Sequence, residues 1–96
     1  MQDERFEWDD IKAATNLTKH KIDFADARKV FDDPVFLDEF DLSMNYDEES
    51  WLAVGMAGGR LIVVTYTMRA DRIRVISARK PTRKERQDYA AQTPHP

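Results

Sequence analysis

Three β-rich runs separated by short turns occupy the second half of the chain and restrict its fold more than any other feature. They cover Trp51–Met56, Leu61–Thr67 and Ile73–Ala78. Gly58-Gly59 supplies the positive-φ residues that a tight hairpin needs, and Ala70-Asp71 fits a second turn. Consecutive strands joined by short turns pair antiparallel, so we predict a three-stranded meander.

The first third of the chain indicates a short strand followed by two helices. Phe6-Glu7-Trp8 alternates apolar and polar side chains, as a half-buried strand does. Asp9 or Asp10 can cap a helix that ends near His20-Lys21, where late cations suit the negative end of the helix dipole.

A second helix is expected from Phe24 to Phe31, because Phe24, Ala27, Val30 and Phe31 recur at helical spacing. Asp32-Asp33-Pro34 should end it, since the residue before a proline is pushed out of the helical region. Val35-Phe36-Leu37 is apolar and opens a further strand.

The last helix is marked by Thr82-Arg83-Lys84-Glu85, which matches the capping box, and should run to about Ala91. The resulting order, β-α-α-β-β-β-β-α, predicts one α+β domain over residues 1–92. Two N-terminal helices and one C-terminal helix would lie on an antiparallel sheet. Residues 93–96 contain two prolines and are expected to form a disordered tail.

Composition excludes several classes of protein. The chain has no cysteine, so it has no disulfide framework, Cys-based zinc site or thiol nucleophile. No segment approaches the ~20 apolar residues that span a bilayer, and no N-terminal run resembles a signal peptide. We therefore expect a soluble cytoplasmic protein. Its histidines and carboxylates lack metal-ligand spacing and no nucleotide-binding loop is present, so neither metal nor cofactor is expected.

The net charge of -3 hides a division between the two parts of the chain. Residues 1–59 hold six Lys/Arg against fifteen Asp/Glu, and residues 60–96 hold nine against three. The segment Phe31–Glu49 has eight acidic residues and no Lys or Arg. This asymmetry suggests a polyanionic ligand or a charged protein partner. The alternative is that the two parts pair with each other across the fold.

Arginines cluster around the last strand and the last helix. Arg72 and Arg74 would share one face of the strand, with Ile73, Val75 and Ser77 on the other. If Arg69, Arg79 and Arg83 converge, their guanidinium groups suit the bidentate binding of a phosphate and the stabilisation of a phosphorane-like transition state. The alternative is that some of the arginines pair with Glu85, Asp88 or the acidic segment on the surface.

Two further side chains carry possible chemistry. His20 could act as a general acid or base near neutral pH, or it could simply cap the end of its helix. Tyr89 lies one helical turn after Arg86 and could stack on a base, donate a proton or pack against the sheet.

Taken together, these residues resemble the BrnT family of bacterial toxins over roughly residues 5–90. The matching stretches are Phe6–Asp9, Lys12–Leu17, Lys19-His20, Phe24–Ala27, Val30–Pro34, Arg69, Arg72–Lys80, Thr82–Arg86 and Tyr89. The resemblance implies a toxin of a type II toxin–antitoxin system with a RelE-like ribonuclease fold. It also implies metal-independent RNA cleavage that stops translation.

The resemblance further implies partners and site residues. The antitoxin would be of the BrnA type, with a ribbon-helix-helix DNA-binding part, in a complex of two toxins and two antitoxins that represses its own operon. Operator DNA would be contacted only through the antitoxin. Arg69, Arg79 and Arg83 would hold the scissile phosphate, with His20 a candidate for proton transfer. The further candidates for RNA contact are Lys19, Arg74, Lys80, Lys84, Arg86 and Tyr89.

The chain departs from the family pattern at three positions. Ser50 stands where members often carry an arginine, Ala70 where a glycine often precedes the aspartate of the turn, and Pro81 where an alanine is common. An arginine missing at position 50 would remove one phosphate contact.

Two other functions remain open at this point. The chain could be a non-catalytic module whose basic patch docks an antitoxin or nucleic acid. It could also be a structural partner whose acidic part recruits a basic antitoxin, in which case charge reversal at Asp47, Glu48 and Glu49 would weaken the complex.

Overall fold

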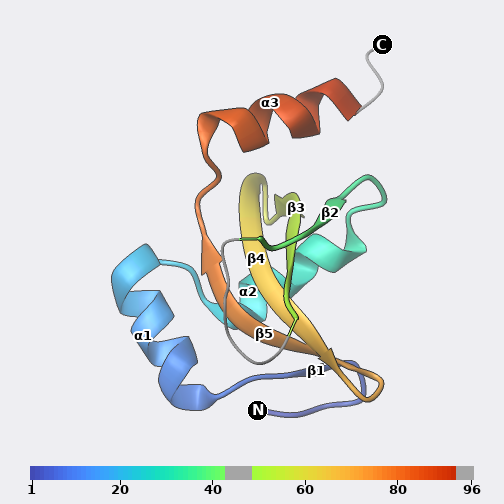
Figure 1. Ribbon diagram of the computed structural model, residues 1–96. Coiled ribbons are helices and arrows are strands. Elements are labelled where there is room, and N and C mark those ends of the chain that lie inside the picture. The colour runs from blue at the N-terminus through green and yellow to red at the C-terminus, as the bar shows by residue number, and fades with distance from the viewer. Residues whose placement is uncertain (43–48, 93–96) are drawn as a thin grey trace.

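The computed structural model describes residues 1–42 and 49–92, and the elements follow the predicted order (Figure 1). They are β1 (Phe6–Glu7), α1 (Asp10–His20), α2 (Phe24–Ala27), the 3-10 helix η1 (Arg28–Asp32), β2 (Leu37–Phe40), β3 (Trp51–Ala57), β4 (Arg60–Arg69), β5 (Arg72–Arg79) and α3 (Arg83–Gln92). The α+β class is therefore confirmed. The predicted tail and the acidic residues Asp47 and Glu48 lie outside the described residues.

The strands form one sheet in the order β1-β5-β4-β3-β2. The meander of β3, β4 and β5 is confirmed, and β2 adds to β3 antiparallel. The expectation of a wholly antiparallel sheet is wrong, because β1 pairs with β5 in parallel. No tight turn joins these two strands, so the turn residues that predict the meander carry no information about the direction of β1.

The helices divide between one face and one end of the sheet (Figure 1). α1 packs on β5, while η1 packs on β3 and β4. α3 lies across the end of the sheet, near the β3–β4 hairpin, and touches β3. The core is buried under the first group of helices, with Phe24, Val30, Ile62 and Val75 at most 1% exposed. The predicted apolar face of the second helix is thus confirmed.

The second helix and the strand after it have different bounds from those predicted. The α-helix ends at Ala27, and the chain continues as a 3-10 helix to Asp32. The Asp33 carboxylate then accepts hydrogen bonds from the N–H of Val35 at 3.0 Å and the N–H of Met56 at 2.8 Å. This turn holds the chain out of the sheet, so β2 begins at Leu37 and not at Val35.

The helix ends follow the predicted chemistry. Asp9 caps α1 by accepting from the N–H groups of Ile11 and Lys12. The capping box of α3 is confirmed by two reciprocal bonds. The N–H of Glu85 donates to Thr82 Oγ1 at 3.2 Å, and the N–H of Thr82 donates to Glu85 Oε1 at 2.7 Å.

A β-bulge interrupts β5. Thr65 pairs with Ser77 and Tyr66 pairs with Val75, so Ile76 is an extra residue in the strand. Beyond the bulge Ala78 belongs to the core, which reverses the alternation. The prediction that Ser77 shares a face with Ile73 and Val75 is therefore wrong.

None of the helices in the described part of the chain is long and apolar enough to cross a membrane.

Candidate nucleic-acid interface

The end of β5 is the meeting point of the sheet, α1 and α3. Arg79 is the last residue of β5, and three residues separate it from the first residue of α3, Arg83. The Arg79 guanidinium forms two hydrogen bonds with Glu85, of 2.8 and 3.0 Å. This fork raises the pKa of Arg79 and lowers the pKa of Glu85 to about 2. The pair is fully ionised at neutral pH.

The sequence-based alternative for this arginine is therefore confirmed, because Arg79 pairs with Glu85. The same guanidinium also donates to the carbonyl oxygen of Lys80 at 3.2 Å. A phosphate that binds Arg79 must use its remaining N–H groups or exchange with the Glu85 carboxylate. Arg83, by contrast, has no carboxylate partner among residues 1–42 and 49–92.

Arg69 does not lie near this point. It pairs with Arg72 beside the β4–β5 turn, whereas Arg79 is at the other end of β5 and pairs with Val63. Seven residue steps of strand separate the two ends, or roughly 20 Å at ~3.3 Å per residue. The predicted convergence of Arg69 with Arg79 and Arg83 is wrong, although Arg79 and Arg83 do share one end of the sheet.

Two other predicted RNA-binding cations are held in ion pairs. Arg74 donates to Glu7 at 2.9 Å, and both side chains are largely buried at the β1–β5 pairing. Lys84 pairs with Asp88 one turn along α3 at 2.8 Å, in an exposed position. The Arg74–Glu7 pair ties β1 to the sheet, so we assign it a structural role.

Tyr89 fixes α3 to the rest of the protein. Its hydroxyl donates to Asp33 Oδ2 at 2.5 Å. Burial and the Asp33 carboxylate raise the pKa of Tyr89 to about 12, so it stays protonated near neutral pH. Burial opposes ionisation of Asp33, but hydrogen bonds from Met56, Tyr89 and Val35 outweigh it and lower the pKa of Asp33. Tyr89 is thus a docking residue of α3 in this structure.

His20 and Lys19 lie in a groove between α1 and β5. Its volume is about 240 Å³, and its lining includes Lys12, Thr15, Lys19, His20, Ile76 and Ser77. No carboxylate lines it in the described part of the chain. The groove runs beside the last residues of β5, which places His20 at the same end of the sheet as Arg79.

A second groove lies between α3 and the β3–β4 hairpin. Its volume is about 550 Å³, and Arg60, Lys80, Arg86 and Tyr89 line it together with Met56 and Leu61. Its lining residues, all of them described, include three cations and no carboxylate. Lys80 and Arg86, both predicted to contact RNA, are brought together here.

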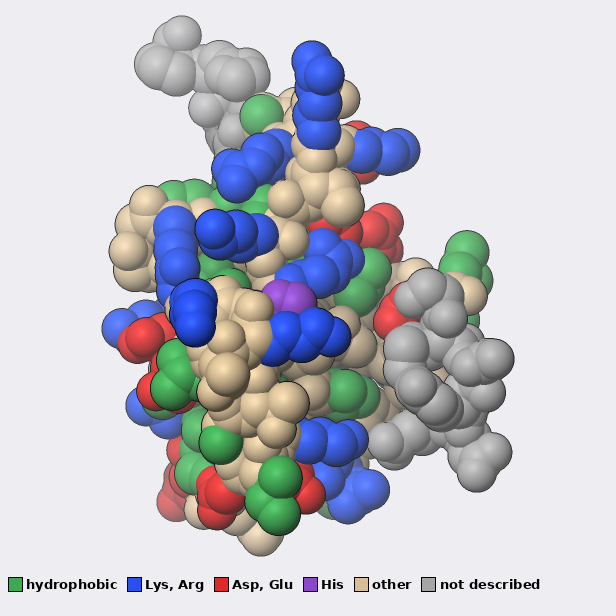
Figure 2. Space-filling view, turned by 90° about the vertical axis from the view of Figure 1, so that its left-hand side faces the viewer, with side chains coloured by type: hydrophobic (Ala, Val, Ile, Leu, Met, Phe, Trp, Pro, Cys, Tyr) green, Lys and Arg blue, Asp and Glu red, His purple; other side chains and the backbone are tan. Residues whose placement is uncertain are grey.

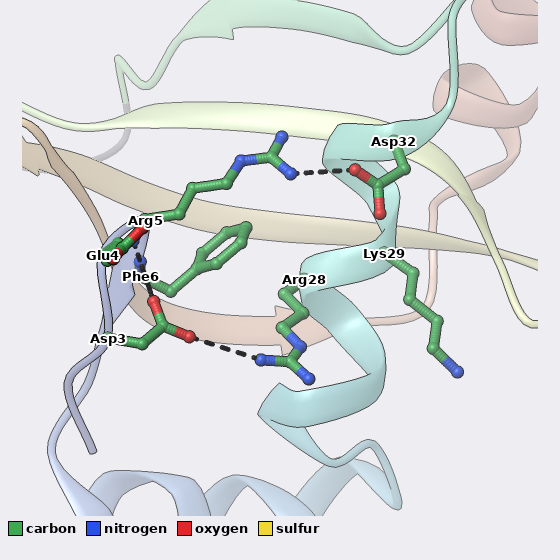
Figure 3. A pocket seen from close by; sticks show the side chains of 7 residues that line it. All are labelled: Asp3, Glu4, Arg5, Phe6, Arg28, Lys29 and Asp32. Carbon is green, nitrogen blue, oxygen red and sulfur yellow. Dashed lines mark hydrogen bonds and ion pairs between the residues drawn. The ribbon is translucent and has the colours of Figure 1, made fainter.

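A third groove, of about 540 Å³, has a different electrostatic character (Figure 3). It lies between the N-terminal segment and η1, and its two arginines point at carboxylates. Arg5 pairs with Asp32 at 2.9 Å and Arg28 with Asp3 at 3.6 Å. These cations are neutralised within the fold, so this groove is a poor site for a polyanion.

Several cations that have no carboxylate partner among the described residues lie on one side of the molecule. Figure 2 shows this side, with Lys and Arg side chains surrounding the one histidine drawn in colour, which is His20 because His95 is drawn in grey. We call this surface the basic face. It comprises Lys12, Lys19 and His20 of the groove between α1 and β5, Lys80 and Arg86 of the second groove, and Arg83 at the start of α3. None of these forms an ion pair with a carboxylate among the described residues.

Ser50 is buried, and its hydroxyl donates to Asp41 at 3.4 Å. Asp41 also acts electrostatically on Arg79, helping to raise its pKa. Ser50 itself directly precedes Trp51, which pairs with Tyr66, whereas Arg79 pairs with Val63, so position 50 lies several residues along the sheet from Arg79. A serine there supplies a hydroxyl and no positive charge.

The sequence-based reasoning missed Lys12, Thr15 and Ile76 as part of this region. Lys12, Thr15 and Lys19 recur at i, i+3 and i+7, which places them on one face of α1. This spacing in the sequence could have predicted that the three side chains lie side by side on the helix. No group of three or more potential metal ligands occurs among the residues that the structure describes.

A family model described as the ribonuclease toxin, BrnT, of a type II toxin–antitoxin system matches residues 8–85. A search of curated proteins finds no significant relative.

Proposed function

Because the chain belongs to the BrnT family of ribonuclease toxins of type II toxin–antitoxin systems, we propose that it cleaves RNA on the basic face, without a metal ion, and thereby inhibits translation in the cytoplasm. The observation that carries this proposal is the gathering of unpaired cations around His20 at the end of β5. The protein as a whole is acidic, so these cations are a local concentration of positive charge.

The chemistry that suits these residues is attack by a 2′-hydroxyl on the adjacent phosphate. The 2′-oxygen forms a new bond to phosphorus, the bond to the 5′-oxygen breaks, and a 2′,3′-cyclic phosphate results. His20 either accepts the proton of the 2′-hydroxyl while water protonates the leaving 5′-oxygen, or donates a proton to the leaving 5′-oxygen while water accepts the proton of the 2′-hydroxyl. Arg83, with Arg79 beside it, stabilises the charge that develops on the phosphoryl oxygens. Lys19, Lys80 and Arg86 hold the flanking phosphates.

We propose that Arg79 exchanges its Glu85 partner for the substrate phosphate. A dianionic phosphorane offers two oxygens to a guanidinium, as the Glu85 carboxylate does in the free protein. Glu85 is then a competitor of the substrate for Arg79, and its carboxylate is ionised throughout the physiological range because its pKa is about 2. Arg69 is left out of the catalytic group because it lies at the far end of β5.

A type II toxin has a cognate antitoxin. We propose that this partner is of the BrnA type, with a ribbon-helix-helix DNA-binding part, and that two copies of each chain assemble and repress the operon through the antitoxin. The acidic segment supports a docking surface for a basic region of that partner. Reversing the charge of the exposed Glu39 and Glu49 should weaken the complex, and unchanged affinity would contradict this docking site.

The ribonuclease proposal is tested by incubating the purified chain, free of antitoxin, with total RNA in EDTA. The Arg79→Ala/Arg83→Ala double variant should lose cleavage. Arg28→Ala is the matched control, because Arg28 is paired with Asp3 in the third groove, away from the basic face, and it should cleave like the wild type. Cleavage that requires magnesium would overturn the mechanism.

A second candidate function rests on Ser50 and on the Arg79–Glu85 pair. With no arginine at position 50 and Arg79 already engaged, the chain could be a non-catalytic partner of the antitoxin and a co-repressor. This alternative predicts a folded wild type that binds RNA or antitoxin, with binding that falls steeply as salt rises, and forms no product.

A further inference from the structure

The groove between α1 and β5 has a floor that is fixed by a buried amide. The side chain of Asn16 is 6% exposed and lies between the two elements. Its Oδ1 accepts from the N–H of Ala78 at 3.1 Å, and its Nδ2 donates to the carbonyl oxygen of Ile22 at 3.0 Å. Both polar ends of the amide are satisfied, so α1 is held at a set distance from β5 and the groove exists before any ligand arrives.

The β-bulge shapes the opposite wall. Because Ile76 is the extra residue in β5, it leaves the regular alternation and lines the groove next to Ser77. Bulges are over-represented beside functional sites, where they redirect a side chain. Ile76 is half-buried, so an aliphatic surface is presented to solvent at this point.

The first turn of α1 supplies a matching aliphatic wall. Ile11 lines the same groove and is 79% exposed, an unusual position for an isoleucine that no other part of the described fold covers. Thr15 and Ser77 place hydroxyl groups in the lining, and Lys12 and Lys19 place ammonium groups there. The groove thus combines apolar walls, neutral hydrogen-bonding groups and cations.

This combination matches the parts of a nucleotide. Apolar walls suit the faces of an unstacked base, hydroxyls can bond its edges, and lysines suit the phosphates on either side. We infer that the groove between α1 and β5 is a subsite for one unpaired nucleotide of single-stranded RNA. It would lie next to the phosphate that His20 and Arg83 act on, and to that extent the inference rests on the proposed function.

The hydroxyls of Thr15 and Ser77 would then help to select the base. A site that bonds the edge of a base rejects a base with the wrong donors and acceptors more strongly than an apolar wall does. Thr15→Ala is therefore expected to change the base found beside the cleavage site while leaving the fold intact, because Thr15 is exposed on α1.

The test is a methyl NMR titration of the full chain with a single-stranded RNA 8-mer whose 2′-hydroxyls are all methylated, so that it binds without being cleaved. The methyl signals of Ile11 and Ile76 should shift on addition of this RNA. Those of Ile22 and Ile62, which are buried in the core, should stay in place. Lys12→Ala should weaken binding several-fold and reduce the salt dependence by about one charge, whereas Lys29→Ala, outside the groove, should do neither.

The outcomes separate this inference from the proposed function. An Arg83→Ala variant that has lost cleavage should keep the Ile11 and Ile76 shifts. If the wild type cleaves RNA but these two signals do not move, the subsite is overturned while the ribonuclease proposal stands. If they move although no RNA is cleaved, the subsite stands and the proposed function fails. Shifts caused by an acidic peptide such as poly-glutamate, and not by RNA, would overturn the subsite in favour of a protein partner.

Discussion

Gly55 lies in β3 where the 3-10 helix and Phe36, the residue before β2, leave no room for a side chain. A Cβ atom at this position would lie 2.9 Å from Val30 Cγ1, 2.9 Å from Phe36 Cβ and 3.2 Å from the carbonyl oxygen of Val30. Such distances force neighbouring atoms to move. The glycine therefore allows η1 to approach the sheet closely enough to bury Val30 completely.

We predict that Gly55→Ala lowers the free energy of unfolding by about 1–3 kcal/mol, the usual cost of overpacking a core. Urea denaturation followed by far-UV circular dichroism measures the change. In the double variant Val30→Ala/Gly55→Ala, the two costs should sum to more than the observed loss, because removing Val30 Cγ1 relieves part of the clash. Simple additivity would contradict the assignment.

Ala70 adopts a positive φ of 55° in the β4–β5 turn. The left-handed conformation raises the free energy of an L-residue by roughly 1–2 kcal/mol because its Cβ crowds the backbone, whereas glycine has no Cβ and avoids this strain. We predict that Ala70→Gly raises the free energy of unfolding by about 0.5–1 kcal/mol, after allowing for the greater freedom of glycine in the unfolded chain. Thermal denaturation of this variant should show a higher Tm, and a lower one would contradict the strain at Ala70.

At the scale of the element, α3 is attached to the domain chiefly by polar contacts. None of its described residues is buried. Glu85 holds it to Arg79 at its start, and Tyr89 holds it to Asp33 one turn later. The orientation of Arg79 and of the cations on α3 therefore depends strongly on these two polar side-chain contacts.

Tyr89→Phe should loosen α3 without unfolding the sheet. It removes a hydrogen bond to an ionised carboxylate, a type worth about 1.5–3 kcal/mol. Amide hydrogen exchange in α3 should quicken by at least about tenfold, while exchange in β4 stays unchanged. Lys84→Ala, which removes only an exposed pair on the same helix, is the matched control and should have little effect. Equal exchange rates in α3 of wild type and Tyr89→Phe would show that another contact holds the helix.

The Arg79–Glu85 pair should give α3 a distinct pH dependence. The pKa of Glu85 is lowered from 4.5 to about 2 by Arg79. A lowered carboxyl pKa stabilises the folded state fully above pH 4.5, and this contribution is lost as the pH falls through 2. The carboxyl carbon signal of Glu85 should titrate with a midpoint near 2, and Arg79→Ala should return the midpoint toward 4.5. A wild-type midpoint near 4.5 would contradict the pairing.

Some elements could be predicted from the sequence because a local signal exists, and others could not. Gly58-Gly59 and the Thr82–Glu85 capping box each specify their own geometry, and both were predicted. The bulge at Ile76 and the parallel pairing of β1 with β5 depend on how distant segments pack, and no local residue marks them. The same holds for the candidate site. The basic character of the β5–α3 junction was predicted, whereas the Arg74–Glu7 ion pair and the hydrogen bond from Tyr89 to Asp33 were not.

The position of Arg69 could have been predicted. A hairpin whose turn is Ala70-Asp71 places Arg69 beside the turn and Arg79 at the other end of the second strand. The expected convergence with Arg79 ignored this consequence of strand geometry.

At the scale of the whole molecule, the two surfaces differ in whether their cations have carboxylate partners, as well as in where the cations lie. The cations of the third groove are neutralised by carboxylates (Figure 3), whereas those of the basic face are not paired within the described fold (Figure 2). An acidic protein can therefore present a surface that attracts RNA, while its carboxylate-rich parts remain available for a basic partner.

The central claim is that this basic face cleaves RNA by 2′-hydroxyl attack. The most direct measurement is the single-turnover rate, in EDTA, on a single-stranded RNA and on the same strand with one 2′-deoxy nucleotide at the mapped cleavage position. We predict that wild type cleaves only the RNA with the intact 2′-hydroxyl, leaving a 2′,3′-cyclic phosphate, and that Arg83→Ala and His20→Ala each lower the rate by about 10²-fold or more. Equal cleavage of both strands, or full activity in both variants, would contradict the account.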